Sequence, residues 1–148
     1  MREILFKAKR IDNGEWIEGY IFDNGFDGEE KKYFVGGLII EKYNGTACDD
    51  WNITGIDFCE INPETLCQFT GLYDKNGKRI WENDVVWLVC DGKEHIYQIV
   101  WDNSELDFKA AKGEENYGTN YEYLLCCDDI EVIGNIFDNP ELLQEEHK

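Results

Sequence analysis

The sequence predicts a mainly β protein, with α+β as the alternative, built from antiparallel strands. Dipeptides that tolerate the positive φ angles of tight hairpins recur at short intervals, Asn-Gly at 13–14, 24–25, 44–45 and 76–77 and Asp-Gly at 27–28 and 91–92. Between them lie short segments rich in aromatic and β-branched residues, 16–22, 33–40, 80–90, 95–101 and 130–137. Neither of the two prolines interrupts a segment. This spacing favours a barrel or a strongly bent sheet.

Two of these segments carry enough pattern to place them in a sheet. Residues 85–90 are apolar throughout, so we expect a central strand there. Residues 91–94 contain Asp-Gly and are short enough for a hairpin loop into residues 95–101. That second segment is apolar on both of its alternating sides, which predicts burial on both faces.

Helices are expected to be few and short. Asn139, Pro140 and Glu141 form a capping residue, a proline at the first helical position and an acid in the first turn, which predicts a short C-terminal helix. Residues 62–66 repeat this pattern over one turn. Residues 104–112, opened by Ser104 and followed by Gly113, are a third candidate.

The length of 148 residues fits a single domain, 1–148, with a possible subdivision into an N-terminal β region, 1–67, and a C-terminal region, 68–148. The hydrophobic fraction of 43% supports a packed core. No apolar run is long enough to cross a bilayer, and no N-terminal stretch resembles an export signal. We therefore expect a cytoplasmic protein without membrane association. Residues 41–67 have the weakest pattern, and the sequence does not show what they pack against.

The charge is the largest departure in composition, with 32 acidic residues against 14 Lys and Arg, a formal net charge of −18. By surface scaling the folded chain carries one net charge per roughly 430 Å², compared with one per roughly 110 Å² for duplex DNA. The chain can therefore imitate DNA only if its acids gather on one face. Direct nucleic-acid binding is disfavoured because it needs a basic patch. Solubility or a basic protein partner fits the charge better.

The six cysteines, at 48, 59, 67, 90, 126 and 127, show no CxxC spacing. Without an export signal we expect reduced thiols that pack as small apolar side chains. If the segment around Cys126 and Cys127 is a strand, these neighbours point to opposite faces.

The stretch 68–86, QFTGLYDKNGKRIWENDVV, closely resembles the core motif of the YopX family of phage and prophage proteins, Q-x-TGLxDKNGKxIxEGD-x-V. Residues 2–8 are similar to the opening strand of that family, and residues 132–143 to its closing segment. Asn83 replaces a usual Gly, and Asn also tolerates left-handed backbone angles. The resemblance implies a phage or prophage source and supplies no catalytic residues, because the family has no established activity.

The motif residues also make sense as folding signals. An acidic turn followed by valines often opens the first strand of a small SH3-like barrel, so by analogy we expect such a barrel in the C-terminal half, between about 68 and 138. On this interpretation a structural role falls to ten residues: Thr70, Gly71, Leu72, Asp74, Asn76, Gly77, Glu82, Asp84, Gly134 and Asn135.

The candidate catalytic and metal-binding patterns are weak. Asp23 begins a stretch similar to an EF-hand loop, but Gly25 and Phe34 stand where the third and twelfth ligands belong. His95 is the only histidine outside the charged tail, in a segment where a packed ring is the commoner outcome. The adjacent acids at 49–50 and 128–129 point to opposite faces if they lie in strands. We therefore expect no enzyme, no cofactor and no metal site.

An aromatic run is the strongest candidate interaction surface. Tyr117, Tyr121 and Tyr123 are set among Asn and Glu, and the last two would share one face of a strand. Tyrosines with polar neighbours are common at protein interfaces, although packing at the edge of a core is the commoner role.

The leading hypothesis is a non-enzymatic phage or prophage accessory protein that binds another protein or self-assembles as a homo-oligomer in the cytoplasm of the bacterial host. The first alternative is a DNA mimic that inhibits a host nucleic-acid-binding protein. The second is a metal-dependent enzyme built on carboxylates with His95.

Overall fold

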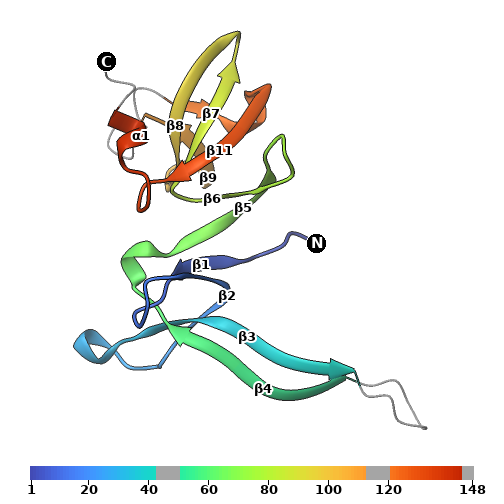
Figure 1. Ribbon diagram of the computed structural model, residues 1–148, viewed down its shortest axis with the longest axis vertical. Helices are drawn as coiled ribbons and strands as arrows, with labels where there is room; N and C mark the ends of the chain where they lie inside the picture. Colours follow the sequence, from blue (N-terminus) through green and yellow to red (C-terminus); the bar gives the residue numbers. More distant parts are fainter. Residues whose placement is uncertain (43–50, 113–120, 145–148) are drawn as a thin grey trace. The chain divides into compact units, whose positions relative to one another are not determined.

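The computed structural model describes residues 1–42, 51–112 and 121–144 (Figure 1). Contacts divide the chain into two compact units. We call Ile4–Leu66 the N-terminal unit, and Cys67–Lys148 together with Met1–Glu3 the C-terminal unit. The mainly β, antiparallel class is confirmed, because the described residues form eleven strands and a single short α-helix, α1.

The N-terminal unit contains four antiparallel strands in the order β4-β3-β2-β1. Their bounds are β1 Phe6–Lys9, β2 Trp16–Asp23, β3 Tyr33–Lys42 and β4 Trp51–Glu60. Figure 1 shows β3 and β4 running side by side as a long hairpin. The weakly patterned stretch after residue 50 is thus a strand of this sheet. A small core of Ala8, Val35 and Ile61 holds the unit together.

Local side chains shape the connections of this unit. In the loop between β2 and β3, Asn24 Oδ1 accepts hydrogen bonds from the backbone N–H groups of Phe26 and Lys32, both at 3.2 Å. The EF-hand-like stretch is therefore an Asn-closed loop, which includes a 3₁₀ turn at Gly28–Glu30. A second 3₁₀ turn, Pro63–Thr65, is capped by Asn62, which accepts a hydrogen bond from Glu64 N–H, as the sequence predicted.

The C-terminal unit contains the remaining strands. The strands β5 and β6 pair with each other, and five further strands form an antiparallel sheet in the order β10-β9-β8-β7-β11. The bounds are β5 Cys67–Tyr73, β6 Arg79–Trp81, β7 Asp84–Cys90, β8 Lys93–Asp102, β9 Asp107–Ala111, β10 Tyr121–Tyr123, β11 Asp129–Asn135 and α1 Glu141–Gln144. The short C-terminal helix predicted from Asn139-Pro140 is present. Buried Ile80, Val86, Leu88, Ile99 and Ala110 form the centre of the core.

The predicted hairpin is present, with a shorter loop than the predicted 91–94, because β8 already begins at Lys93. Asp91 and Gly92 form a two-residue loop between β7 and β8, with φ angles of 52° and 76°, and Cys90 pairs with Lys93 across it. The strand β7 is flanked by β8 and β11, so residues 85–90 occupy the expected interior position. In β8 the residues from Tyr97 to Val100 are buried, while Trp101 is partly exposed near the end of the strand.

The SH3-like barrel stays a prediction. Among the described strands, β10 and β11 lie at opposite edges of the five-stranded sheet, and no described pairing joins them. Among the described residues, no helix is long and apolar enough to span a bilayer.

Two local predictions were wrong. The candidate helix at 104–112 is a turn followed by β9, because Asp102 Oδ1 accepts hydrogen bonds from Ser104 N–H and Oγ, and the next residues pair with β8. The cysteines are not all reduced, since Cys90 and Cys127 form a disulfide. Cys126 ends a 3₁₀ turn, Leu124–Cys126, so the condition of a strand around Cys126 and Cys127 is not met. The Cα atoms of Cys90 and Cys127 lie 4.5 Å apart.

Candidate functional site

A cleft of about 360 Å³ opens on the surface of the C-terminal unit. It lies where β5, the turn between β8 and β9, and the 3₁₀ turn after β10 meet. We call it the aromatic cleft; its lining consists of Arg2, Gln68, Phe69, Thr70, Leu72, Trp101, Leu106, Asp107, Phe108, Tyr123, Leu124 and Leu125. It therefore unites part of the YopX-like motif with one of the tyrosines singled out in the sequence.

Apolar and aromatic side chains make up most of the cleft. Phe69 is buried and packs against Trp81 with ring centroids 5.6 Å apart. Trp101 meets Phe108 edge-on at 4.9 Å. Leu125, by contrast, is 87% exposed at the rim. Such a surface provides a hollow and an exposed apolar edge for a partner's side chain.

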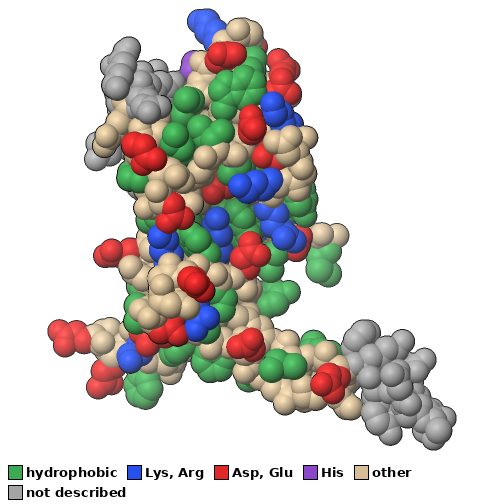
Figure 2. Space-filling view, in the orientation of Figure 1, with side chains coloured by type: hydrophobic (Ala, Val, Ile, Leu, Met, Phe, Trp, Pro, Cys, Tyr) green, Lys and Arg blue, Asp and Glu red, His purple; other side chains and the backbone are tan. Residues whose placement is uncertain are grey.

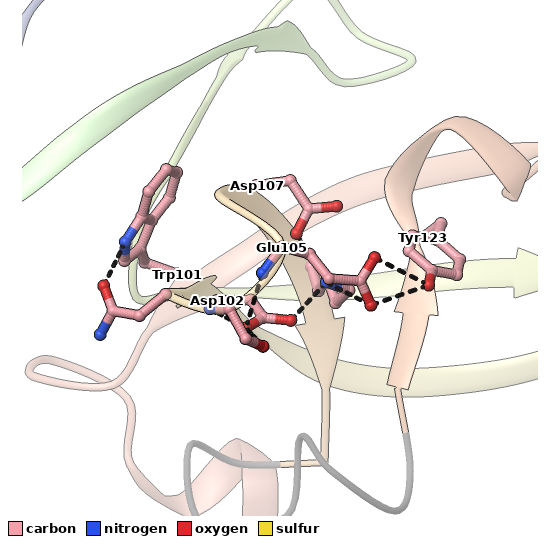
Figure 3. A network of polar contacts seen from close by, with 8 residues as sticks. Trp101, Asp102, Glu105, Asp107 and Tyr123 are labelled. Carbon is pink, nitrogen blue, oxygen red and sulfur yellow. Dashed lines mark hydrogen bonds and ion pairs between the residues drawn. The ribbon is translucent and has the colours of Figure 1, made fainter.

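A network of polar contacts centred on Lys109 lies beside the cleft, and Figure 3 labels its carboxylates Asp102, Glu105 and Asp107. Lys109 Nζ lies 2.5 Å from an oxygen of Asp102, 2.6 Å from one of Asp107 and 3.6 Å from one of Glu105. The side chains of Lys109 and Asp102 are almost fully buried, whereas those of Glu105 and Asp107 are partly exposed. Three carboxylates facing one ammonium give this cluster a net charge of −2, with negative charge directed to solvent.

The buried pair is firmly ionised. Burial alone would lower the pKa of Lys109, but hydrogen bonds to Asp102 and Asp107 and the charges of these carboxylates raise it above its ordinary value. The hydrogen bonds from Lys109 and then Ser104 lower the pKa of Asp102 well below the usual range. Because Lys109 keeps its proton at neutral pH, its nitrogen has no free lone pair for nucleophilic chemistry.

Tyr123 links the cluster to the rim of the cleft. Its hydroxyl lies 3.1 Å from both carboxylate oxygens of Glu105, to which it donates (Figure 3). Tyr121 and Tyr123 meet edge-on at 5.5 Å, and Lys109 Nζ lies 5.6 and 5.1 Å from their ring centroids. Hydrogen bonding to Tyr121 and then to Glu105 raises the pKa of Tyr123 to about 12. The Tyr123 hydroxyl therefore stays neutral at physiological pH.

The structure brings Tyr121 and Tyr123 together on β10, as strand alternation predicted. Tyr117 lies outside the described residues.

The motif residues of β5 and β6 serve mostly as local connectors. Thr70 Oγ1 donates to Ile80 O at 2.7 Å and accepts from Leu72 N–H at 3.2 Å, while Thr70 and Leu72 also line the cleft. Gly71 and Gly77 have positive φ angles of 89° and 80°. Asp74 Oδ1 accepts from Asn76 N–H at 2.9 Å, inside the tight turn.

The other motif residues hold the start of β7 and the end of β11. Glu82 Oε1 accepts from Gln68 N–H at 3.2 Å, and Asp84 Oδ2 accepts from Trp81 N–H at 2.8 Å. Asn135 Oδ1 accepts from Phe137 N–H at 3.0 Å. A Cβ atom at Gly134 would lie 2.6 Å from Asn139 Oδ1, so a side chain at this position would force the Asn139 side chain to shift.

Asn83 adopts the left-handed conformation expected from its place in the motif, with φ of 70°. Its backbone N–H donates to Ile99 O at 2.8 Å, and its Oδ1 accepts from Gln98 Nε2 at 3.1 Å. These bonds offset the strain that a side chain brings to this backbone conformation.

Sequence reasoning missed Lys109, Asp102 and Glu105. The one signal was a lysine in an otherwise apolar segment, between Phe108 and two alanines, which is unusual for a buried strand. The ion partner Asp102 lies seven residues away, and only the pairing of β8 with β9 brings the two together.

The candidate catalytic and metal-binding residues from the sequence that the structure describes do not line the aromatic cleft. His95 stacks on Tyr97 with ring centroids 4.6 Å apart. Within the described ranges, no group of three or more His, Cys, Asp or Glu side chains is placed to hold a metal ion. Asp129 begins β11 and Asp128 directly precedes it, and the acids at 49–50 lie outside the described residues.

Comparison with known proteins identifies the family. The family model described as "YopX protein" matches residues 14–144. The chain belongs to the YopX family. The crystal structure of protein EF1440 from Enterococcus faecalis is similar, with a TM-score of 0.54, 22% sequence identity, and coverage of 97% of this chain and 99% of that one. At this identity the YopX chain shares the fold with that protein, and the likeness says nothing about activity. A search of curated proteins found no match.

Proposed function

We propose that this YopX protein is a non-enzymatic accessory protein of a phage or prophage, which acts in the cytoplasm of the bacterial host by binding another protein through the aromatic cleft. The observation that carries the proposal is the combination of an apolar hollow with a carboxylate rim at one place. Asp107 lines the cleft, and Glu105 lies beside it, where its carboxylate accepts from the hydroxyl of the lining residue Tyr123. Leu125 supplies an exposed apolar edge.

The chemistry of the cleft specifies the partner. An aliphatic or aromatic side chain would enter the hollow beside Phe69 and Phe108. A Lys or Arg next to it would pair with Glu105 or Asp107, because the three carboxylates around Lys109 still outnumber the two cations, Lys109 and Arg2 of the cleft lining. The partner is therefore a protein segment with an apolar residue flanked by basic ones.

The surface charge supports local recognition of this kind over imitation of DNA. On the face seen in Figure 2, the Asp and Glu side chains are interspersed with Lys and Arg. A DNA mimic needs acids spaced like phosphates along one face.

The test is a capture experiment on immobilised protein, with host lysate eluted in salt steps and identified by mass spectrometry. Leu125→Ser removes the apolar edge, and Ile11→Ser is the matched control on the other unit, because both side chains are largely exposed. Glu105→Gln removes a rim charge, and Glu29→Gln is its control. Circular dichroism verifies that each variant is folded.

We expect a basic partner that Leu125→Ser binds about tenfold more weakly, since burying a leucine is worth about 1.5 kcal/mol or more. Glu105→Gln should weaken binding and reduce its dependence on salt. Both controls should bind like the original protein. Empty eluates, or partners that Leu125→Ser and Glu105→Gln retain in full, would contradict the proposal.

A further inference from the structure

The N-terminal unit exposes a continuous row of large apolar side chains on one face of its sheet. Paired residues in a sheet share a face, and the register places Tyr20 beside Gly36 and Phe58, and Leu38 beside Ile56. The members of this apolar face are Tyr20, Phe22, Leu38, Ile40, Ile53, Ile56 and Phe58, each between 42% and 65% exposed. Half-buried Phe34 packs edge-on against Phe58 at 5.3 Å and belongs to the same face.

The size of this face matches an interface. Seven side chains of this kind, about half exposed, present roughly 700 Å² of surface if each contributes about 100 Å². The largest apolar patch on an ordinary monomer is about 300–600 Å². A standard interface buries about 800 Å² on each partner.

The charges around the face restrict what can cover it. Charged side chains of both signs stand at its edges: Glu60, paired with Lys32 at 3.7 Å, and Glu18 in β2, which lies opposite Lys7 of β1 on the same face. Asp57 pairs with Gly37, on the opposite face of the sheet. A basic or an acidic partner would therefore find no opposite charge at the centre of the face. The occupant has to be uncharged and apolar over an equal area.

We propose that the apolar face binds the same face of a second copy of this chain, which forms a two-fold symmetric dimer. A copy meets the requirement because its own face has the same area and the same uncharged centre. In a chain with a net charge of −18, contact through this uncharged face also keeps the acids of the two copies away from the interface. The proposal goes beyond the proposed function, since it concerns a different unit and a different surface.

The two ends of the face are complementary. A hollow of about 370 Å³ lies at the aromatic end, lined by Phe22, Asp23, Asn24, Phe34, Ile56 and Phe58. Ile53, the most exposed member, stands at the aliphatic end. A two-fold axis between the ends would place Ile53 of each copy over the hollow of the other, as two sheets pack face to face in a sandwich.

Sedimentation velocity of the full chain over a wide concentration range tests the dimer. We expect a species of twice 17.3 kDa for the original protein. Ile53→Glu should shift it to monomer, with association weakened at least tenfold, because the dimer would bury an unpaired carboxylate. The matched control is Ile39→Glu, since Ile39 is 46% exposed on the opposite face of the same hairpin, beside Gly55.

Ile53→Ser provides a milder second variant, and thermal unfolding verifies that each variant is folded. A monomer at all concentrations for the original protein would overturn the proposal. So would equal dissociation by Ile39→Glu, or a dimer that Ile53→Glu and Ile53→Ser leave intact. The Leu125→Ser variant should remain dimeric, because Leu125 belongs to the aromatic cleft and not to the apolar face. A loss of partner binding is thereby distinguished from a loss of dimerisation.

Discussion

Asp74 Oδ2 accepts a hydrogen bond from the backbone N–H of Val132 at 3.0 Å, across 58 residues of sequence. The other oxygen of the same carboxylate accepts from Asn76 N–H and Lys78 N–H at 2.9 and 2.8 Å. Lys75 N–H also donates to Ile130 O at 2.9 Å. The DKNG turn of the YopX motif is thereby tied to β11, which contains the first residues of the segment 132–143 that resembles the closing segment of the family.

Replacement of Asp74 should destabilise the C-terminal unit. The Asp74 carboxylate is buried and accepts three backbone hydrogen bonds, so Asp74→Ala leaves three N–H groups without their acceptor. We expect a loss of about 3 kcal/mol in the free energy of unfolding, measured by urea denaturation. Asp129→Ala, at an exposed position in β11, should cost less than about 0.5 kcal/mol. Equal losses for the two variants would show that the Asp74 contacts add no stability.

The stability of the fold should fall in acid because of the same carboxylate. Burial would raise the pKa of Asp74, but the hydrogen bonds from Val132, Lys78 and Asn76 outweigh it and hold the pKa below the ordinary value of 3.8. Since the folded-state pKa is depressed, the stabilisation is complete above about pH 4 and disappears as pH falls through the folded-state value. Denaturation at a series of pH values should show the difference between the original protein and Asp74→Asn shrinking below about pH 4. A difference that stays constant down to pH 2 would count against this linkage.

Removal of the buried ammonium group of Lys109 should lower the free energy of unfolding more than removal of an exposed ammonium group. Lys109→Met leaves Asp102 buried without its counter-ion, which should lower the free energy of unfolding by about 3–5 kcal/mol. The double variant with Asp102→Asn should recover part of this loss, because the uncompensated charge is gone. Lys32→Met, at an exposed ion pair, should cost less than about 1 kcal/mol. A double variant no more stable than Lys109→Met alone would contradict the account.

The disulfide should stabilise the C-terminal unit in oxidising solution. Cys90 and Cys127 are 37 residues apart, and a cross-link closing a loop of that size is worth about 4 kcal/mol in the chain-entropy treatment. Urea denaturation with and without a reducing agent measures the difference. The reducing agent should not change the free energy of unfolding of the Cys90→Ala, Cys127→Ala double variant. If it lowers the stability of that variant as much as that of the original protein, the effect comes from other cysteines.

Local turn chemistry made much of the fold predictable. The Asp91-Gly92 hairpin, the Asn62 cap and the positive φ of Asn83 follow from conformational preferences that need no information from elsewhere in the chain. The prediction failed at 104–112, where the capping residue Ser104 suggested a helix. There the hydrogen bonds of Asp102 and pairing with β8 outweighed local preference.

The candidate site was predictable only in part. Strand alternation correctly placed Tyr121 and Tyr123 on one face, because that relationship depends on a two-residue period. The ion pair of Lys109 with Asp102 depends on which strands become neighbours.

The sequence by itself determined the β class, the principal turns and membership in the YopX family, because each depends on residues close together in the chain. Only the tertiary structure decided the partner of Cys127, the burial of Lys109 and the position of the apolar face. These features arise from contacts between distant segments, whose pairing and register no local pattern specifies. In the sequence, an apolar residue in a strand looks the same whether its face of the sheet is buried or exposed to solvent. The packing of the whole unit decides whether that face is buried.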